Sequence, residues 1–342
     1  MKSRRTAMGL VAGAVLLASL VFGAAQAATN AQTARVASPR LVIGYSDPLA
    51  SEEGLRAVGY GARQAIKKLK LPWTVRELDA KLSADKQVSD VDTFVSLGVK
   101  GIMSWTLDPG AADAAYKRAR NAGIAMIGLN STSKYFNSVM AADTDTTCRV
   151  ANQQAAYIAK LVPGAKVLAI GGPPVPSITL STNCFLKAAK REGLNVLESQ
   201  NETTGTQAGG QRVAENLLLK HPDVQALWVF SDGDALGAAA ALAASGKQVW
   251  SGNNKGIVLV SRNGVQAAID AVKAGRMTAT WDNNQPLLGA AAVQILKKIL
   301  VDKVPPSKIP KRVAIPSQRW DLTTIGKYKS PLKRAVPLPL GQ

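Results

Sequence analysis

Strand-like and helix-like patterns of hydrophobic positions alternate along the chain from Leu41 to Leu300. Leu41–Tyr45 has the composition of a buried strand, and the apolar residues from Leu55 to Leu69 then recur at spacings of three and four, which is one face of a helix. Further strand-like runs, each separated from the next by a helical segment, are Trp73–Leu78, Gly101–Trp105, Ile124–Leu129, Lys166–Ile170, Val196–Ser199, Ala226–Phe230, Ile257–Val260 and Met277–Trp281. This alternation predicts parallel strands with crossover helices.

The alternation forms two series that meet at Val139–Ala142, a segment that we expect to cross from one series to the other. Each series is long enough for a lobe of its own. The sequence therefore predicts an α/β fold with two doubly wound parallel-sheet lobes. The tail after Asp302 is rich in Pro, Lys and Arg and contains one strand-like piece, Arg312–Ile315.

The N-terminal 27 residues have the pattern of an export signal. A short basic head precedes the charge-free run Met8–Phe22, and Ala25-Gln26-Ala27 is a small-x-small cleavage pattern. A membrane anchor that is never cleaved is the alternative. Arg4-Arg5 leaves the twin-arginine route open, although we favour the ordinary one. Without a Cys at the cleavage site, we expect a free periplasmic protein that starts near Ala28, with a polar linker over residues 28–39.

The chain is strongly basic, but its charge does not point to nucleic acid. The formal net charge is +19, of which three cations lie in the predicted signal, leaving +16. The remaining basic residues are scattered in pairs such as Lys67-Lys68 and Lys297-Lys298, without interleaved aromatics. We therefore interpret the charge as a solvated surface and expect a monomer without a nucleic-acid partner.

Polar side chains follow most of the predicted strands, where ligands bind in parallel α/β sheets. As a set they predict a polar pocket, although Asn and Asp are also common turn formers and helix caps. The candidate ligand-binding residues at these strand ends are Ser46, Asp47, Trp105, Asp108, Asn130, Ser131, Ser231, Asp232, Arg262, Asn263 and Asn283.

The residue inventory speaks against an enzyme. His221 is the only histidine and lies in a Lys-His-Pro-Asp turn. This argues against a Ser-His-Asp triad in the cleft and against a zinc site made of His and Cys ligands. The Gly171–Ser177 segment follows a strand as phosphate loops do, but it lacks their Lys and contains three prolines. We expect no catalytic residue, no metal and no cofactor.

Several segments resemble the ribose- and galactose-type periplasmic sugar-binding proteins of ABC importers. Leu97–Ile102 with Leu107-Asp108-Pro109, Asn121–Ile124 with Asn130, Lys220–Ala226 with Asp232, and Ala271–Gly275 resemble stretches of that family in order and spacing. The resemblance implies a type I periplasmic binding protein fold, with lobes at 40–138 plus 284–310 and 139–283 plus 311–342 joined by a three-segment hinge. It implies an exported protein that clamps a small polar ligand, a sugar or sugar derivative, for a membrane permease. A receptor that reports to a membrane sensor is the alternative.

The resemblance also adds candidate site residues and changes the expected pocket. Ser181 and Asn183 fall near an arginine of the family, and Glu53 lies in a first loop that reads Glu52-Glu53-Gly54-Leu55 where the family often has Asn-Pro-Phe-Phe. Trp105 and Trp281 are candidate aromatic plates against the apolar face of a sugar, with core packing as the alternative for both. With Ser131 and Ser181 where arginines are expected, an aldopentose bound in the usual way is doubtful, and the cargo stays open.

Two cysteines, Cys148 and Cys184, are candidates for a disulfide. The predicted compartment is oxidising, and both residues fall near predicted helix starts in the same lobe. Two buried free thiols are the alternative.

Overall fold

The computed structural model describes residues 41–142, 148–252 and 254–341. The predicted export signal and polar linker lie outside these described residues. Among the described helices, none combines the length and the apolar character needed to cross a membrane.

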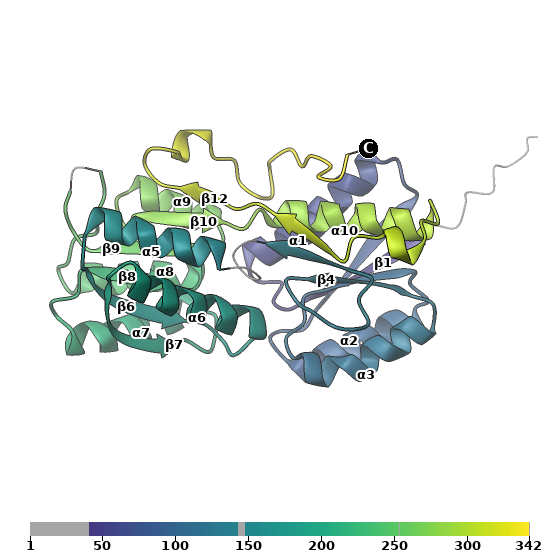
Figure 1. The fold of residues 1–342 in the computed structure, drawn as a ribbon, viewed down its shortest axis with the longest axis horizontal. Coiled ribbons are helices and arrows are strands. Elements are labelled where there is room, and N and C mark those ends of the chain that lie inside the picture. Colours follow the sequence, from purple (N-terminus) through teal and green to yellow (C-terminus); the bar gives the residue numbers. More distant parts are fainter. Residues whose placement is uncertain (1–40, 143–147, 253, 342) are drawn as a thin grey trace, which may run out of the picture. The chain divides into compact units, whose positions relative to one another are not determined.

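The first lobe is a parallel six-stranded sheet in the order β11-β5-β4-β3-β1-β2. Helices α1 and α10 cover one face of this sheet, and α2 and α3 cover the other (Figure 1). The elements are β1 (Leu41–Asp47), α1 (Glu53–Lys68), β2 (Trp73–Asp79), α2 (Ala84–Ser96), β3 (Gly101–Ser104), α3 (Pro109–Asn121), β4 (Ala125–Leu129), β5 (Ser138–Ala142), α10 (Gln285–Leu300), η1 (Pro306–Lys308) and β11 (Arg312–Ile315).

The second lobe repeats this plan around a sheet in the order β12-β10-β9-β8-β6-β7, with only β12 antiparallel to its neighbour. Helices α5 and α6 pack on one face, and α7, α8 and α9 pack on the other. The elements are α5 (Arg149–Leu161), β6 (Lys166–Gly171), α6 (Pro176–Arg191), β7 (Asn195–Asn201), α7 (Gln207–Lys220), β8 (Ala226–Val229), α8 (Asp232–Ala244), β9 (Val258–Arg262), α9 (Gln266–Lys273), β10 (Ala279–Asp282), β12 (Gln318–Trp320) and η2 (Ile325–Lys327). The predicted α/β fold with two doubly wound lobes is confirmed.

The boundaries between the lobes differ from the predicted ones. We expected the second lobe to begin at residue 139 and to resume at residue 311, but β5 pairs with β4, and β11 pairs with β5. Residues 138–142 and 312–315 therefore belong to the first lobe. The prediction was wrong here because an apolar run shows that a strand is buried but not which sheet it joins.

The C-terminal tail connects the two lobes and does not belong to the second alone. We call residues 321–341 the C-terminal strap. The hydroxyl of Tyr328 donates to the carbonyl of Gly264 in the second lobe, whereas Val336 is buried in the core of the first. The chain thus passes between the lobes after β5, between β10 and α10, between β11 and β12, and once more along the strap.

Helices α1 and α10 approach each other closely beside the hinge. A Cβ atom on Gly289 would overlap the backbone of Val58, and one on Gly61 would overlap the carbonyl of Pro286. Glycine at both positions therefore allows α10, which starts just after the crossing at Asn284, to lie directly on α1.

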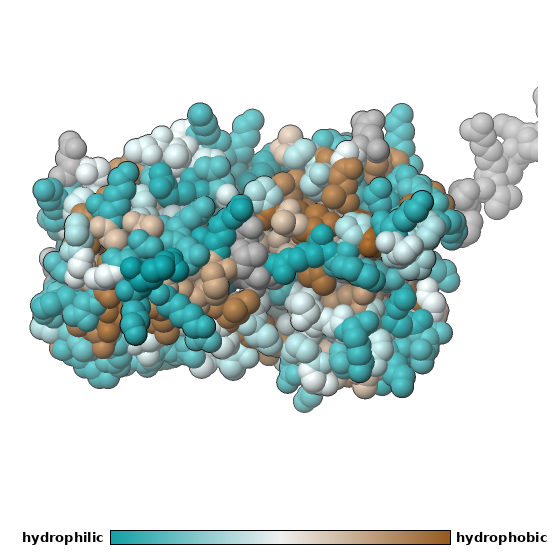
Figure 2. All heavy atoms as spheres, in the orientation of Figure 1, coloured by the Kyte–Doolittle hydropathy of each residue, from teal (hydrophilic) through white to brown (hydrophobic). Residues whose placement is uncertain are grey.

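Hydrophilic side chains spread over both lobes on the face drawn in Figure 2. Two of the basic pairs have a local role, since Lys67 and Lys68 lie in the last turn of α1, and Lys297 and Lys298 lie in the last turn of α10. Cations in the last turn of a helix interact favourably with its dipole. These pairs therefore support helix ends.

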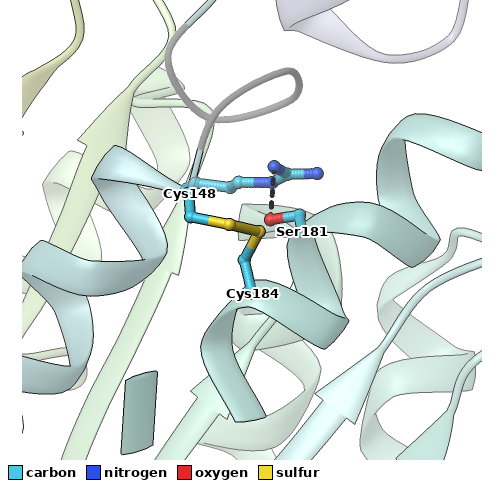
Figure 3. The surroundings of a disulfide bond; sticks show 4 residues. Cys148, Ser181 and Cys184 are labelled. Carbon is cyan, nitrogen blue, oxygen red and sulfur yellow. Dashed lines mark hydrogen bonds between the residues drawn. A yellow bond between two sulfur atoms is a disulfide. The ribbon is translucent and has the colours of Figure 1, made fainter. Parts of the chain in front are cut away.

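A disulfide joins Cys148 to Cys184 in the second lobe, with a Cα–Cα distance of 5.2 Å. Cys148 is the N-cap residue of α5. Cys184 lies in the middle of α6 and not near its start as expected, because α6 begins at Pro176. Figure 3 shows Ser181 one turn before Cys184 on the same helix.

Candidate functional site

A cavity of about 90 Å³ lies between the two lobes, beyond the carboxyl ends of strands from both sheets. Loops after β1, β3, β6, β8, β9 and β10 contribute to it, as the doubly wound topology requires. Its described lining residues are Pro48, Leu49, Glu52, Leu55, Leu82, Trp105, Leu107, Pro173, Val175, Ile178, Gly205, Phe230, Ser231, Arg262, Asn263, Asn283 and Gln285.

A chain of hydrogen bonds crosses the cavity from the hinge to the first lobe. The Nδ2 of Asn283 donates to Oδ1 of Asn263 at 3.1 Å, and Nδ2 of Asn263 donates to Oε1 of Glu52 at 3.4 Å. The backbone N–H of Gly54 donates to the other oxygen of Glu52. Burial raises the pKa of Glu52, while these two donors oppose the rise. The three side chains thus connect both lobes and the hinge through one polar path.

Two acceptor atoms beside this path are buried without a hydrogen-bond partner among the described residues. They are Oδ1 of Asn283 and Oε1 of Gln285. Both residues line the cavity, and the two oxygens themselves have almost no exposed surface.

Arg262 lies at the cavity in a fixed orientation, with only 2% of its surface exposed. Its Nε donates to the carbonyl of Phe230 at 2.9 Å, and its Nη1 donates to the hydroxyl of Ser181 at 2.9 Å. The guanidinium carbon lies 4.8 Å from the centre of the Phe230 ring, a cation–π distance. Ser181, a predicted ligand residue, therefore holds Arg262 and does not itself line the cavity.

Gln87 on α2 holds the loop that carries Trp105. Its Nε2 donates to the carbonyl of Trp105 and to the hydroxyl of Ser46, and its Oε1 accepts from the N–H of Leu107. Ser46, another predicted ligand residue, is thus buried behind the site. Sequence reasoning missed Gln87 because it considered only residues that follow strands.

Leucine, valine and isoleucine side chains from both lobes form an apolar wall of the cavity. Leu107 of the first lobe and Val175 of the second are in one buried cluster, with Leu82 and Ile178 packed against it. Sequence reasoning missed these residues because it searched strand ends for polar side chains. The sequence signal closest to these residues was the run Pro173–Pro176. Proline is favoured in the first turn of a helix, and α6 begins at Pro176.

Five predicted ligand residues line the cavity: Trp105, Ser231, Arg262, Asn263 and Asn283. Asn130 and Ser131 instead line a separate pocket of about 280 Å³, together with Thr106 and Ser177. Thr106 and Ser177 of this pocket are close in sequence to Leu107 and Val175 of the cavity wall.

Two predicted carboxylates are buried supports of the strand ends. Asp47 accepts from the N–H of Leu49, and burial raises its pKa to about 8. Asp232 accepts from the hydroxyls of Ser261 and Thr280, and burial raises its pKa to about 7 against these hydrogen bonds. Neither lines the cavity in the described part of the chain.

Three further candidates do not line the cavity. Asp108 caps α3 through the N–H groups of Gly110 and Ala111. Glu53 accepts weakly from the N–H of Gln266 and the hydroxyl of Ser330, at 3.4 and 3.3 Å. Asn183 is exposed in a shallow surface pocket with Thr179 and Asn201. It lies two positions from Ser181, and residues at that spacing on a helix do not face the same side.

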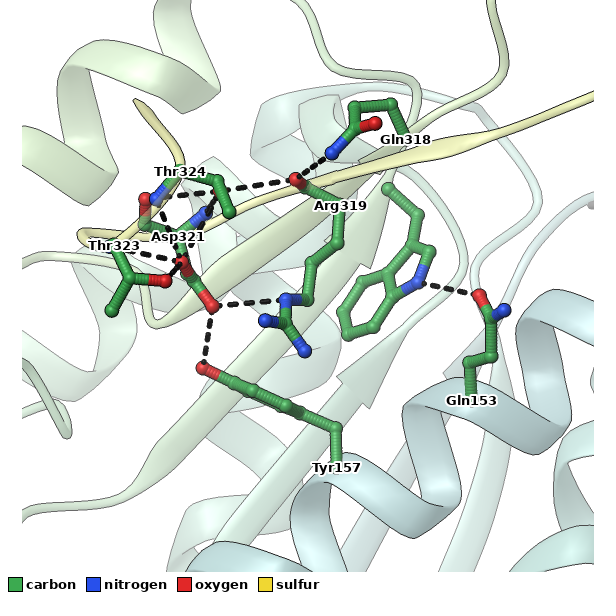
Figure 4. Close-up of polar contacts among 8 residues, drawn as sticks. Gln153, Tyr157, Gln318, Arg319, Asp321, Thr323 and Thr324 are labelled. Carbon is green, nitrogen blue, oxygen red and sulfur yellow. Dashed lines mark hydrogen bonds and ion pairs between the residues drawn. The ribbon is translucent and has the colours of Figure 1, made fainter. Parts of the chain in front are cut away.

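Trp281 is not an aromatic plate of the cavity. It is 2% exposed, and its ring lies edge-on to Tyr157 with centroids 5.6 Å apart. Its Nε1 donates to Gln153 on α5, beside the polar cluster of Arg319 and Asp321 in Figure 4. Side chains alternate between the two faces of a strand, and this alternation turns Trp281 toward α5.

His221 lies far from this chemistry and pairs with Glu198 through Nε2 at 2.9 Å, at the end of α7. Within the described residues, no group of three or more His, Cys, Asp or Glu side chains is arranged to hold a metal ion.

Comparison with known proteins places the chain among binding proteins with this architecture. Residues 43–303 match the family model described as a periplasmic binding protein domain. The ribose import binding protein of Escherichia coli (strain K12) is 30% identical over 245 residues, which cover 70% of this chain and 79% of that protein. The ribose import binding protein of Bacillus subtilis (strain 168) is 28% identical over 242 residues, which cover 70% and 74%.

Solved structures agree with the fold. An ABC transporter periplasmic solute binding protein from Actinobacillus succinogenes, with bound D-allose, has a TM-score of 0.74 at 20% identity. The match covers 85% of this chain and all of that one. A twin-arginine translocation pathway signal protein from Burkholderia phytofirmans has a TM-score of 0.73 at 18% identity, covering 84% and 92%. At these identities the likeness concerns the two-lobed fold.

Proposed function

The chain belongs to the periplasmic binding protein family, and from this membership we propose that it is the solute-binding component of an ABC importer. The relatives that it matches are named as binding proteins, so the chain is a binding protein and not an enzyme. The family name indicates the periplasm, which the chain would reach through the predicted export signal. A membrane permease would then receive the cargo.

The observation that carries this proposal is the polar path from Asn283 through Asn263 to Glu52, with unpaired acceptors beside it. Residues from the two lobes and the hinge meet around this cavity, so one small molecule there could contact all three parts. The relatives are named for ribose and allose, and a sugar presents several hydroxyl groups that can donate to acceptors and accept from donors. We propose a sugar or sugar derivative as the ligand.

Binding would be coupled to the relative position of the lobes. Glu52 comes from the first lobe and Asn263 from the second, so a ligand that bonds to both gains more from the closed arrangement than from an open one. A ligand shifts such an equilibrium only by its differential affinity for the two states. The closed, loaded form is then the form that a permease recognises.

We predict that the mature protein is stabilised by one or more members of a panel of monosaccharides and deoxy sugars. A ligand at a hundredfold excess over its Kd adds about 2.7 kcal/mol to the free energy of unfolding, which corresponds to several degrees in Tm. Differential scanning fluorimetry measures the shift. Mass spectrometry of the denatured protein checks for a co-purified sugar, and a blank result in both measurements would contradict a sugar as the ligand.

The Glu52→Gln variant is expected to bind its sugar about tenfold more weakly, because a hydrogen bond to a charged acceptor contributes about 1.5–3 kcal/mol. Glu192→Gln is the matched control, because Glu192 is the C-cap residue of α6 and does not line the cavity. Wild-type affinity should also fall as the pH drops through the raised pKa of Glu52, and Glu52→Gln should flatten that dependence. Titration calorimetry at pH 5 and pH 8 tests both; equal losses in the two variants would remove Glu52 from the site.

A further inference from the structure

We propose that the ligand is a sugar with one unhydroxylated edge, such as a 6-deoxyhexose, and not a fully hydroxylated sugar. This inference rests on the proposed function and specifies its substrate class. It follows from the lining of the cavity, in which apolar side chains from both lobes outnumber the polar ones.

The apolar side is built by both lobes and is closely packed. Leu107 and Val175 are 7% and 8% exposed and belong to one cluster that spans the lobes. A Cβ atom on Gly205 of the second lobe would lie 3.6 Å from Leu82 of the first. These side chains leave no polar group among themselves to receive a hydroxyl.

Two aromatic rings extend the apolar side. Trp105 is 8% exposed and lines the cavity from the first lobe, while Phe230 lines it from the second. The Phe230 ring also packs against the guanidinium of Arg262 and against Gly172, which hold it in place. Carbon-bound hydrogens of a ligand pack well against such rings.

Polar side chains also line the cavity. Those of Glu52, Asn263, Asn283 and Gln285 supply acceptors, and those of Ser231 and Arg262 supply donors. The orientation of the Asn283 amide is fixed, because its Nδ2 donates to Asn263. Hydroxyl donors on one edge of a sugar ring satisfy these acceptors.

A fully hydroxylated sugar would place a hydroxyl against the apolar side. A hydroxyl buried without a partner is unfavourable, whereas a methyl group at that place gains from burial. One group of this size changes affinity by about tenfold or more. The cavity therefore favours a methyl group where a hexose carries its terminal hydroxymethyl.

The test compares sugar pairs that differ only in this group: D-fucose with D-galactose, L-fucose with L-galactose, and L-rhamnose with L-mannose. We expect the deoxy member of at least one pair to bind at least tenfold more tightly in titration calorimetry. Binding by fully hydroxylated sugars alone, or equal affinity within every pair that binds, overturns this inference and leaves the proposed function standing. No binding by any sugar overturns both.

The Leu107→Asn variant links the preference to the apolar side. An amide at this position can pair with a hydroxyl, so the ratio of affinities within the binding pair should fall by about tenfold. Leu219→Asn on α7 is the control, because Leu219 is 83% exposed and lies away from the cavity. An unchanged ratio in Leu107→Asn, with the fold intact by circular dichroism, would also overturn the inference.

Discussion

Replacing both Cys148 and Cys184 by Ser is expected to lower the free energy of unfolding by about 4 kcal/mol. The disulfide closes a loop with a sequence separation of 36 residues, and a crosslink of that span removes substantial chain entropy from the unfolded state. The loop contains α5, β6 and the first half of α6, which together form one face of the second lobe. A loss of this size is a large fraction of the stability of a typical domain.

Urea unfolding of the oxidised wild type and the double variant measures the loss, with m-values compared to check that both unfold alike. Reducing agent should lower the stability of the wild type to that of the variant and leave the variant unchanged. If the variant and the wild type unfold at the same urea concentration, the crosslink does not contribute to stability. Sugar affinity is a second readout, because α6 also carries Ile178 of the cavity wall and Ser181, which holds Arg262.

The alternation of strands and helices could be predicted from the sequence because it depends on local burial. Strands such as Lys166–Gly171 are buried on both faces and read as continuous apolar runs. Sheet membership could not be predicted in the same way. Residues 138–142 and 312–315 pair with each other over a long sequence distance, and nothing in either segment alone specifies that partner.

The polar part of the site could be located from strand topology, but not the direction of each side chain. Trp281 and Asn283 are two residues apart, yet Trp281 is the strand residue that turns toward α5, while Asn283 lies past the strand end and reaches the cavity. Likewise Glu52, the N-cap residue of α1, lines the cavity, and its neighbour Glu53 does not. Whether such a side chain lines the cavity depends on the exact residue at which a helix or strand ends. A sequence pattern does not fix that residue.

The apolar side of the cavity could not be predicted from residue type. Leu82, Leu107 and Val175 have the composition of core residues, and apolar residues are most often core. Only the packing of one lobe against the other shows that they form a wall of the cavity. A site described by its polar residues alone would have suggested a more fully hydroxylated ligand.

The Arg334→Met variant is expected to lose about 3–5 kcal/mol of stability at neutral pH, because it leaves the buried carboxylate of Asp282 without its ion partner. Nη2 of Arg334 lies 2.5 Å from Oδ2 of Asp282, whose side chain is fully buried. Trp320 donates to the same oxygen, and the N–H of Asn284 donates to the other. These two neutral donors stay in place in the variant but do not supply the positive charge.

Arg334 lies where the C-terminal strap leaves the second lobe for the first. Its carbonyl accepts from the hydroxyl of Tyr60 on α1, and two residues later the carbonyl of Val336 accepts from Lys68. The ion pair with Asp282 therefore anchors the strap at the end of β10, directly before the crossing into α10. Loss of this ion pair therefore weakens the second lobe, and it also weakens the attachment of the strap to the hinge.

The pH dependence of this loss distinguishes a charge effect from lost packing. Burial raises the pKa of Asp282, and Arg334 opposes the rise, so the variant should hold the Asp282 proton to higher pH than the wild type. When folding raises the pKa of a group, that group stabilises the folded protein most at a pH below its pKa in the unfolded chain. This contribution is lost as the pH rises through the pKa of the group in the folded protein. The loss in Arg334→Met should therefore be small near pH 4 and grow toward pH 8. Arg212→Met, at an exposed position on α7, is the control, and a loss in Arg334→Met that is constant with pH would mean that Arg334 acts through packing alone.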